Sequence, residues 1–290
     1  MLKQLAKLYE FDYGFVTNFD EKLNYSEEKL SKVASVCTNP KVIMSNCKTV
    51  VVIAFKHDVS CSSSNIASFA LGEDYHRRLN RIGKELEPMF KNGKFLVDTH
   101  LLNERYFAQK SGIGFIGKNS MFISEKYGSY CHLALLLTSE KIIASTPKIS
   151  DCNNCRLCID ACPVEAIDDQ IDCRNCISER LQKRNNLNFD KLGNNVYGCD
   201  ICQKVCPMNN GKYNECIVET LTPVLLSMTR NEFKQYDNRG FYWIGYRTFI
   251  RNIHIAYINK TKDYSKLKYL ESSNSGYIKK VIKILKGEDI

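Results

Sequence analysis

The stretch DCNNCRLCIDACP (151–163) holds four cysteines in the spacing C-x₂-C-x₂-C-x₃-C, and a proline follows the fourth. This is the spacing of the cysteines that bind [4Fe–4S] clusters in bacterial two-cluster ferredoxins. Three closely spaced thiolates in one loop reach three irons of the same cube, whereas the fourth cysteine leaves the loop and ligates the other cluster. The stretch therefore predicts a second cluster, with further ligands elsewhere in the chain.

A second run, GCDICQKVCP (198–207), supplies most of those ligands, because its last cysteine also precedes a proline. We expect the first cluster to be bound by Cys152, Cys155, Cys158 and Cys206. The second cluster would take Cys162, Cys199 and Cys202, with either Cys173 or Cys176 as its fourth ligand. Zinc is the alternative, since Cys₄ zinc sites also use C-x₂-C pairs. Zinc would not need the x₃-Cys-Pro feature at both runs, so the pattern favours clusters.

The chain has fourteen cysteines among 290 residues, and its N-terminus lacks the apolar run of a signal peptide. No stretch approaches the roughly 18 apolar residues that suggest a membrane span. We therefore expect a cytoplasmic protein whose cysteines are not paired in disulfides. Five cysteines are isolated from the two runs, and we expect them to be small buried apolar residues. They are Cys37, Cys47, Cys61, Cys131 and Cys216.

The formal charge is +9, and two clusters with four thiolates each would lower it to about +5. Residues 211–290 contain fourteen Lys and Arg against eight Asp and Glu, a net +6. Such a basic segment favours a polyanionic partner such as nucleic acid, or is an ordinary solvated face. Arg247 and Arg251 lie four residues apart and therefore on one helix face, where they would contact RNA phosphates or solvent.

Hydrophobic periodicity predicts an α/β or α+β front domain over residues 1–148. Residues 149–212 are cysteine-rich, and metal would organise them. Residues 213–290 are helical in pattern and resemble a fragment of an α-solenoid. In the front domain the predicted helices are 1–10, 24–36, 74–91 and 103–112, and the predicted strands are 48–55, 94–100, 120–124 and 130–139. Residues 60–64 and 112–119 are predicted as loops, and 217–228, 231–236, 246–259 and 276–286 as helices.

Three stretches together resemble the epoxyqueuosine reductase family, which are cobalamin-dependent enzymes of tRNA modification. They are GEDYHRRL (72–79), VDTHLLNERYFAQKSGIGFIGKNSMFIS (97–124), and the cluster region with DCRNCIS (172–178) and YGCDICQKVCPMN (197–209). The resemblance implies an α+β protein with an α/β cobalamin domain, a ferredoxin-like two-cluster domain and a short HEAT-like tail. It also implies reduction of epoxyqueuosine to queuosine in tRNA, with electrons passing from the clusters to cobalamin.

The resemblance assigns roles to single residues. Cys176, which precedes Ile-Ser, would be the remaining cluster ligand, and Asp98 in the V-D-T motif would be the proton donor beside cobalamin. A carboxyl can donate near neutral pH only if its pKa is raised, and burial at the end of the apolar strand would raise the pKa of Asp98. Further cobalamin contacts carried over are Phe122, Leu133, Ser178, Asp200 and Ile201. His100 does not complete a D-x-H-x-x-G cobalt-ligand motif, because position 103 is Asn.

Two other functions remain open from the sequence. One is a cobalamin and iron–sulfur reductase of a small molecule, and the other is a two-cluster electron-transfer protein without enzymatic activity. Under the favoured interpretation we expect a monomer that binds a tRNA anticodon stem-loop and no membrane. It would receive electrons from a flavodoxin- or ferredoxin-like donor.

Overall fold

The computed structural model describes residues 1–19, 37–147, 150–168, 171–184, 189, 191–218, 223–271 and 275–288. The chain forms two compact units, each assembled from stretches that are distant in sequence. The first comprises Met1–His57, Tyr75–Cys155 and Pro207–Lys212, and the second comprises Asp58–Asp74, Arg156–Cys206 and Tyr213–Ile290. The division at residues 148 and 212 stays a prediction, and the predicted helix 24–36 lies outside the described residues.

The first unit is built on a four-stranded antiparallel sheet in the order β1-β2-β7-β4. Its strands are β1 (Phe11–Val16), β2 (Thr49–Lys56), β4 (Lys94–Leu96) and β7 (Cys131–Thr138). Every residue of β2 except the last is buried. The predicted strand 48–55 is confirmed by β2, which is buried on both faces because an uninterrupted apolar, β-branched run has no polar face to offer to water.

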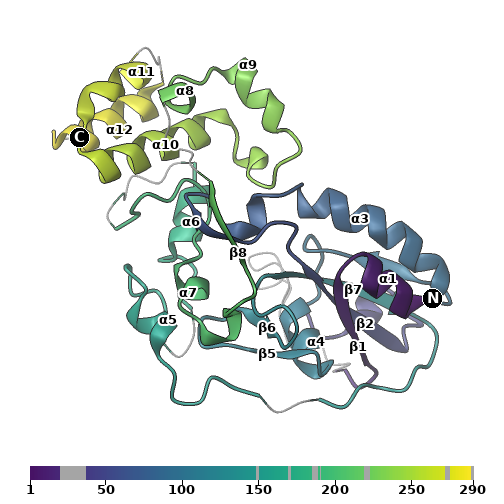
Figure 1. Cartoon of the computed structure of the whole chain (residues 1–290). Helices are drawn as coiled ribbons and strands as arrows, with labels where there is room; N and C mark the ends of the chain where they lie inside the picture. The colour runs from purple at the N-terminus through teal and green to yellow at the C-terminus, as the bar shows by residue number, and fades with distance from the viewer. Residues whose placement is uncertain are drawn as a thin grey trace. The chain divides into compact units, whose positions relative to one another are not determined.

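Helices cover both faces of this sheet (Figure 1). Alternate residues of β2 point to opposite sides. Val51 and Ile53 pack in one apolar cluster with residues of α1 (Leu2–Leu8) and α3 (Tyr75–Leu86). Val50 and Val52 pack in another with residues of α4 (Glu104–Lys110). The predicted helix 74–91 is confirmed as far as Leu86; Pro88 lies in the 3₁₀ turn that follows.

Two sequence predictions for the first unit are wrong in part. Residues 112–119 were expected to form only a loop, but β5 (Gly114–Ile116) and β6 (Phe122–Ser124) form an antiparallel hairpin. Gly114 permits this pairing, because a Cβ there would collide with the carbonyl oxygen of Ile123. Strand β1 was not predicted, since its sequence FDYGFV mixes polar residues and a glycine with apolar ones.

The second unit contains one short parallel pair, β3 (Cys61–Ser64) with β8 (Asn214–Val218). This corrects the predicted loop over 60–64 and the start of the predicted helix 217–228, of which residues 219–222 lie outside the described residues and Pro223–Leu226 are helical as expected. Each strand finds its partner far away in sequence, so neither local polarity nor periodicity reveals it. Its helices are α5 (Leu157–Asp160), α6 (Ile177–Gln182), α7 (Ile201–Lys204), α8 (Pro223–Leu226), α9 (Arg230–Phe233), α10 (Tyr246–Thr261), α11 (Lys268–Glu271) and α12 (Gly276–Lys286).

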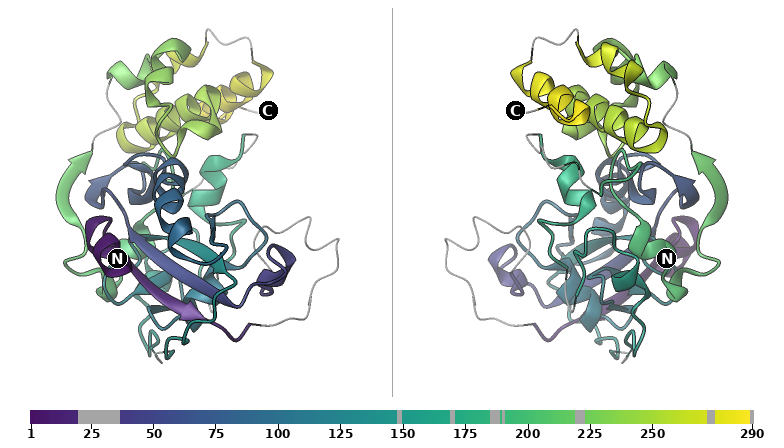
Figure 2. Two further views of the ribbon diagram at one scale, coloured as in Figure 1. Left: turned by 90° about the vertical axis from the view of Figure 1, so that its right-hand side faces the viewer. Right: turned by 90° about the vertical axis from the view of Figure 1, so that its left-hand side faces the viewer.

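The predicted helices 231–236, 246–259 and 276–286 are confirmed by α9 with the 3₁₀ turn after it, by α10 and by α12. Figure 2 shows α10, α11 and α12 side by side. The cysteine-rich segment packs on them through a shared apolar cluster that joins Ile177 and Leu181 of α6 to Ile255 of α10 and Val281 of α12. Apolar burial therefore organises this segment as well as metal.

The isolated cysteines follow the prediction where their side chains are described. Cys37 and Cys47 are buried, and Cys131 is half-buried with its thiol pKa raised to about 12 by burial. The side chains of Cys61 and Cys216 lie outside the described part. None of the described helices has the length and apolarity needed to cross a lipid bilayer.

Candidate active site

Asp98 lies just beyond β4, in a turn whose backbone is fixed by α4. Its φ of +51° is in the left-handed region, which aspartate tolerates better than most residues. Its backbone N–H donates to Oε1 of Glu104, the first residue of α4, over 3.1 Å. The side chain is 54% exposed, because this turn carries it out of the plane of the strand. The carboxyl of Asp98 is thus presented at the surface of the first unit.

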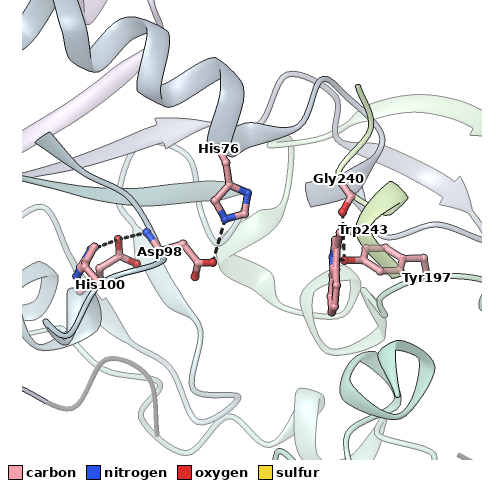
Figure 3. Close-up of polar contacts among 7 residues, drawn as sticks. His76, Asp98, His100, Tyr197, Gly240 and Trp243 are labelled. Atoms are coloured by element: carbon pink, nitrogen blue, oxygen red, sulfur yellow. Dashed lines mark hydrogen bonds and ion pairs between the residues drawn. The ribbon is translucent and has the colours of Figure 1, made fainter. Parts of the chain in front are cut away.

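His76, from the first turn of α3, holds this carboxyl. Its Nε2 lies 3.0 Å from Oδ2 of Asp98 (Figure 3). A hydrogen bond from the side chain of Tyr75 adds to this contact. The hydrogen bond with His76 is the main reason that the pKa of Asp98 is lowered, and it outweighs the opposing effect of burial. The prediction that desolvation raises this pKa is therefore wrong for the described conformation. The carboxyl is an ionised acceptor at neutral pH, and any proton the pair holds resides on His76.

His100 fixes the same turn and has no free ring nitrogen. Its side chain is only 5% exposed. Nδ1 accepts the backbone N–H of Leu102 over 3.1 Å, so Nε2 is the nitrogen that donates to Oε1 of Glu104 over 3.2 Å. Figure 3 shows His100 on the opposite side of the turn backbone from the Asp98 carboxyl. His100 therefore orients the turn.

A row of stacked rings lies behind His76. The ring of Tyr75 stacks on His76 at 4.0 Å and on His132 of β7 at 4.2 Å, and His132 lies 4.2 Å from His57. Burial lowers the pKa of His57 to about 3 and lowers the pKa of His132 as well. Both rings are therefore neutral at physiological pH and act as packing behind the Asp98–His76 pair.

Sequence reasoning had included His76 in a motif but gave it no role. It is 22 residues from Asp98, and only the fold brings the two together.

Three of the proposed ligands of the second cluster lie together in the second unit. Cys162, Cys176 and Cys199 all pack against the apolar cluster around Ile177. Burial, with a smaller contribution from the neighbouring thiols of Cys176 and Cys162, raises the pKa of Cys199 to about 12. Such a group of thiols loses its protons only when cationic iron replaces them, which is the chemistry expected of cluster ligands.

Backbone N–H groups already point at these sulfurs. The N–H of Ala166 donates to Sγ of Cys162 over 3.3 Å, and Cys176 and Cys199 also accept backbone hydrogen bonds. Such bonds tune clusters in iron–sulfur proteins. Between the two candidates for the fourth position, Cys176 is half-buried at the start of α6 and Cys173 is exposed.

The loop that begins the first cysteine run is braced by Lys118. Its ammonium donates to the carbonyls of Asn153 at 2.8 Å and Cys155 at 2.9 Å. The ammonium of Lys118 is thus fixed at this loop, where its positive charge would stabilise a negatively charged cluster. Among the described residues no three His, Cys, Asp or Glu side chains converge on a point where a single metal ion would bind. The four thiolates of a cube bind four different irons and do not share one.

The five further residues assigned to cobalamin by resemblance differ in how far their side chains are buried. Leu133, Ser178 and Ile201 are half-buried and keep surface that a ligand can contact. Phe122 is buried in the core of the first unit. Asp200 is buried too, and its carboxylate already accepts hydrogen bonds from the backbone of Ser68 and the side chain of Gln203. Leu133, Ser178 and Ile201 therefore keep surface for a ligand, whereas Phe122 and Asp200 do not.

Arg251 is not a surface cation, which corrects the expectation that it meets RNA or solvent beside Arg247. It is 1% exposed. Its guanidinium donates to the carbonyls of Leu181, Lys183 and Arg184 at the end of α6. Arg247 is exposed, as expected.

Comparison with known proteins places these features in a family. Residues 151–209 match the family model described as a 4Fe-4S double cluster binding domain. An epoxyqueuosine reductase of Synechococcus sp. (strain CC9605) is 31% identical over 219 residues, which are 69% of this chain and 68% of the relative. The chain belongs to the epoxyqueuosine reductase family.

Solved epoxyqueuosine reductases share the fold along nearly the whole chain. The structure from Streptococcus thermophilus superposes with a TM-score of 0.81 at 29% identity and covers 99% of this chain and 89% of that one. Another epoxyqueuosine reductase, solved with a tRNA-Tyr epoxyqueuosine-modified stem loop, has a TM-score of 0.76 at 25% identity and 98% coverage of both chains. This epoxyqueuosine reductase family member is therefore an oxidoreductase with a mixed α/β fold and a double [4Fe–4S] domain.

Proposed function

We propose that this chain reduces epoxyqueuosine to queuosine in tRNA. Removing the epoxide oxygen as water requires two electrons and two protons, so the enzyme must bring an electron path and a proton source to one bond. The double-cluster domain provides the first, and the Asp98–His76 pair provides the second. That pair, 3.0 Å apart and open on the carboxyl side, is the observation that carries the proposal.

The two side chains of the pair have different roles in proton transfer. Asp98 faces outward and contacts the departing oxygen, whereas His76 is its hydrogen-bond partner and relays protons to the carboxylate. When negative charge develops on the oxygen, the Asp98 carboxylate takes a proton from Nε2 of His76 and passes it to the oxygen. Each turnover thus breaks both C–O bonds of the epoxide, leaves a C=C double bond and forms the two O–H bonds of water, so the pair delivers two protons and is reloaded from solvent.

The cofactors that the family implies would supply the electrons. When bound, cobalamin supplies electrons at its cobalt, and the clusters deliver them singly. We assign cobalamin contacts to Leu133, Ser178 and Ile201, and supporting roles to the buried Phe122 and Asp200. We assign the first cluster to Cys152, Cys155, Cys158 and Cys206, and the second to Cys162, Cys176, Cys199 and Cys202. The related structure with a modified tRNA stem loop supports tRNA as the partner.

The test is anaerobic reconstitution with iron, sulfide and cobalamin, followed by conversion of tRNA that contains epoxyqueuosine. Asp98→Asn should lower kcat by about 100-fold or more while both cofactors stay bound. Glu140→Gln removes an exposed carboxylate from the same unit and should leave kcat unchanged. Absence of queuosine with the fully loaded protein would overturn the proposal, and loss of cobalamin from Asp98→Asn would make Asp98 structural. Conversion of a free small-molecule epoxide but not of tRNA would favour the small-molecule alternative.

A further inference from the structure

The second unit contains a cavity of about 660 Å³ among its C-terminal helices. Four of its lining side chains are cationic: Arg184, Arg230, Lys234 and Arg247. All four are exposed, and none forms an ion pair with any residue that the structure describes. No acidic residue is among the described residues that line it. Cations gathered around a hollow without carboxylates favour an anionic ligand.

The positive end of a long helix opens into this cavity. Gly245, Tyr246, Arg247 and Thr248 all line it, and they are the N-cap and first turn of α10, a helix of 16 residues. No side chain caps this end, and its first turn has no acidic residue. Its N–H groups and helix dipole therefore add to the field of the cationic side chains. The nearby Glu232 accepts hydrogen bonds from Thr229 in the capping box of α9, and its single negative charge offsets only part of the field of the four cations.

The ligand that fits is larger than a lone phosphate and has a flat part. Tyr242 and Tyr246 form aromatic walls of the cavity, and the guanidinium of Arg230 lies 6.0 Å from the ring centre of Tyr246. Aromatic faces combined with cations are the features by which proteins bind unpaired nucleotides, with bases stacked on rings and phosphates on Arg and Lys.

Trp243, the sole tryptophan of the chain, lies between two lining residues and is 57% exposed. Its indole is held in place from behind. Nε1 donates to the hydroxyl of the buried Tyr197 over 2.8 Å, and that hydroxyl donates to the carbonyl of Gly240 over 3.3 Å (Figure 3). A large aromatic side chain fixed by hydrogen bonds with more than half of its surface exposed is a preorganised stacking platform.

We propose that this cavity and Trp243 form an RNA-binding site, which we call the α10 site. A backbone phosphate binds at the first turn of α10 between Arg230 and Arg247, and an unpaired base stacks on Trp243. The proposal rests on the proposed function, since it assigns part of the tRNA to a surface of this chain. It goes further because it names a site of nucleotide size that contains neither Asp98 nor His76.

The test measures RNA binding without turnover. The cluster-loaded protein is titrated with an unmodified anticodon stem-loop RNA, and the fluorescence of Trp243 is followed, because a stacked base quenches an indole. We expect quenching that saturates. The double variant Arg230→Gln, Arg247→Gln should raise Kd at least tenfold. It should also lower the slope of log K against log salt by about 0.7–0.9 per lost phosphate contact.

Matched controls distinguish RNA binding at the α10 site from nonspecific attraction of RNA to a positively charged protein. Lys280→Gln removes one exposed cation from α12 and should change Kd by less than twofold. Trp243→Phe removes the fluorescence signal, so its affinity is measured by anisotropy of labelled RNA and should fall about fivefold. Melting temperatures of the double variant and of Lys280→Gln should match that of the parent. Equal Kd for parent and double variant would overturn the proposal, as would saturating quenching by inorganic phosphate at the concentrations at which RNA binds.

The outcomes of the two proposals are distinguishable. If the loaded enzyme converts epoxyqueuosine-tRNA and the double variant does so with unchanged KM, the α10 site is overturned and the proposed function stands. If RNA binds through Arg230, Arg247 and Trp243 but no queuosine forms, the α10 site stands and the reductase function is overturned.

Discussion

Arg251 is the residue whose replacement tests the packing of the second unit most directly. Its guanidinium makes six hydrogen bonds, to the three carbonyls at the end of α6, to the Tyr277 hydroxyl and twice to the side-chain oxygen of Asn252. The cation lies at the C-terminus of α6, where the helix dipole is negative. Burial lowers its pKa, so the site holds this charge only because these acceptors surround it.

Arg251→Met keeps most of the apolar stem and removes every donor. One buried carbonyl, two part-buried carbonyls and a tyrosine hydroxyl lose their partner, and each unsatisfied buried group costs about 1–3 kcal/mol. Part of that cost is offset because a buried charge no longer has to be desolvated. We expect a net loss of about 3–5 kcal/mol in the free energy of unfolding, or roughly 6–20 °C in Tm.

The control is Arg247→Met on the same helix, one turn earlier and exposed, which should change stability by less than about 0.5 kcal/mol. Thermal unfolding of both loaded variants is followed by far-UV circular dichroism, and iron release is followed in parallel. Iron should leave Arg251→Met sooner, because α6 begins directly after Cys176. Equal melting temperatures for the two variants would refute the structural role of Arg251.

Two further predictions concern the catalytic pair and the cluster ligands. Because His76 lowers the pKa of Asp98, the pair contributes stability above the ordinary carboxyl pKa, and the contribution is lost as pH falls through the lowered value. In the parent, kcat should fall as pH rises and the pair loses its proton; in His76→Gln this limb should move to lower pH, with kcat at pH 7 down about 100-fold. An unchanged kcat–pH profile would contradict the proton role. Cys176→Ser should lose about four of eight irons, whereas Cys173→Ser should keep them all, and the reverse result in iron analysis would exchange the two ligands.

The cluster chemistry was predictable from sequence because its signal is local. Cysteines that share one cube must be close along the chain, so spacing alone indicates ligand chemistry. β2 and α10 were also predictable from local sequence. The long apolar run of β2 indicates a strand, and the periodic run of α10 indicates a helix. Strands β3 and β8 were missed for the opposite reason, since each is a strand only through the other.

The fates of Arg247 and Arg251 show a second limit of sequence reasoning. Helical spacing places both on one side of α10, and their chemistry is identical. One is exposed and the other is almost completely buried, because the carbonyls at the end of α6 face only the second. No pattern within α10 distinguishes them, since the deciding acceptors belong to another element.

Asp98 shows both what a sequence motif can indicate and what only the fold determines. Its motif identified the residue, but the strand before it suggested a buried carboxyl with a raised pKa. The left-handed turn at Asp98 reverses this expectation: it exposes 54% of the side chain, weakens desolvation, and lets His76 dominate. A carboxylate in this setting cannot store a proton at neutral pH by itself. A proton-donating role for Asp98 therefore requires His76 as its partner, and a family member with Asp98 but without a histidine at position 76 should depend on a different donor.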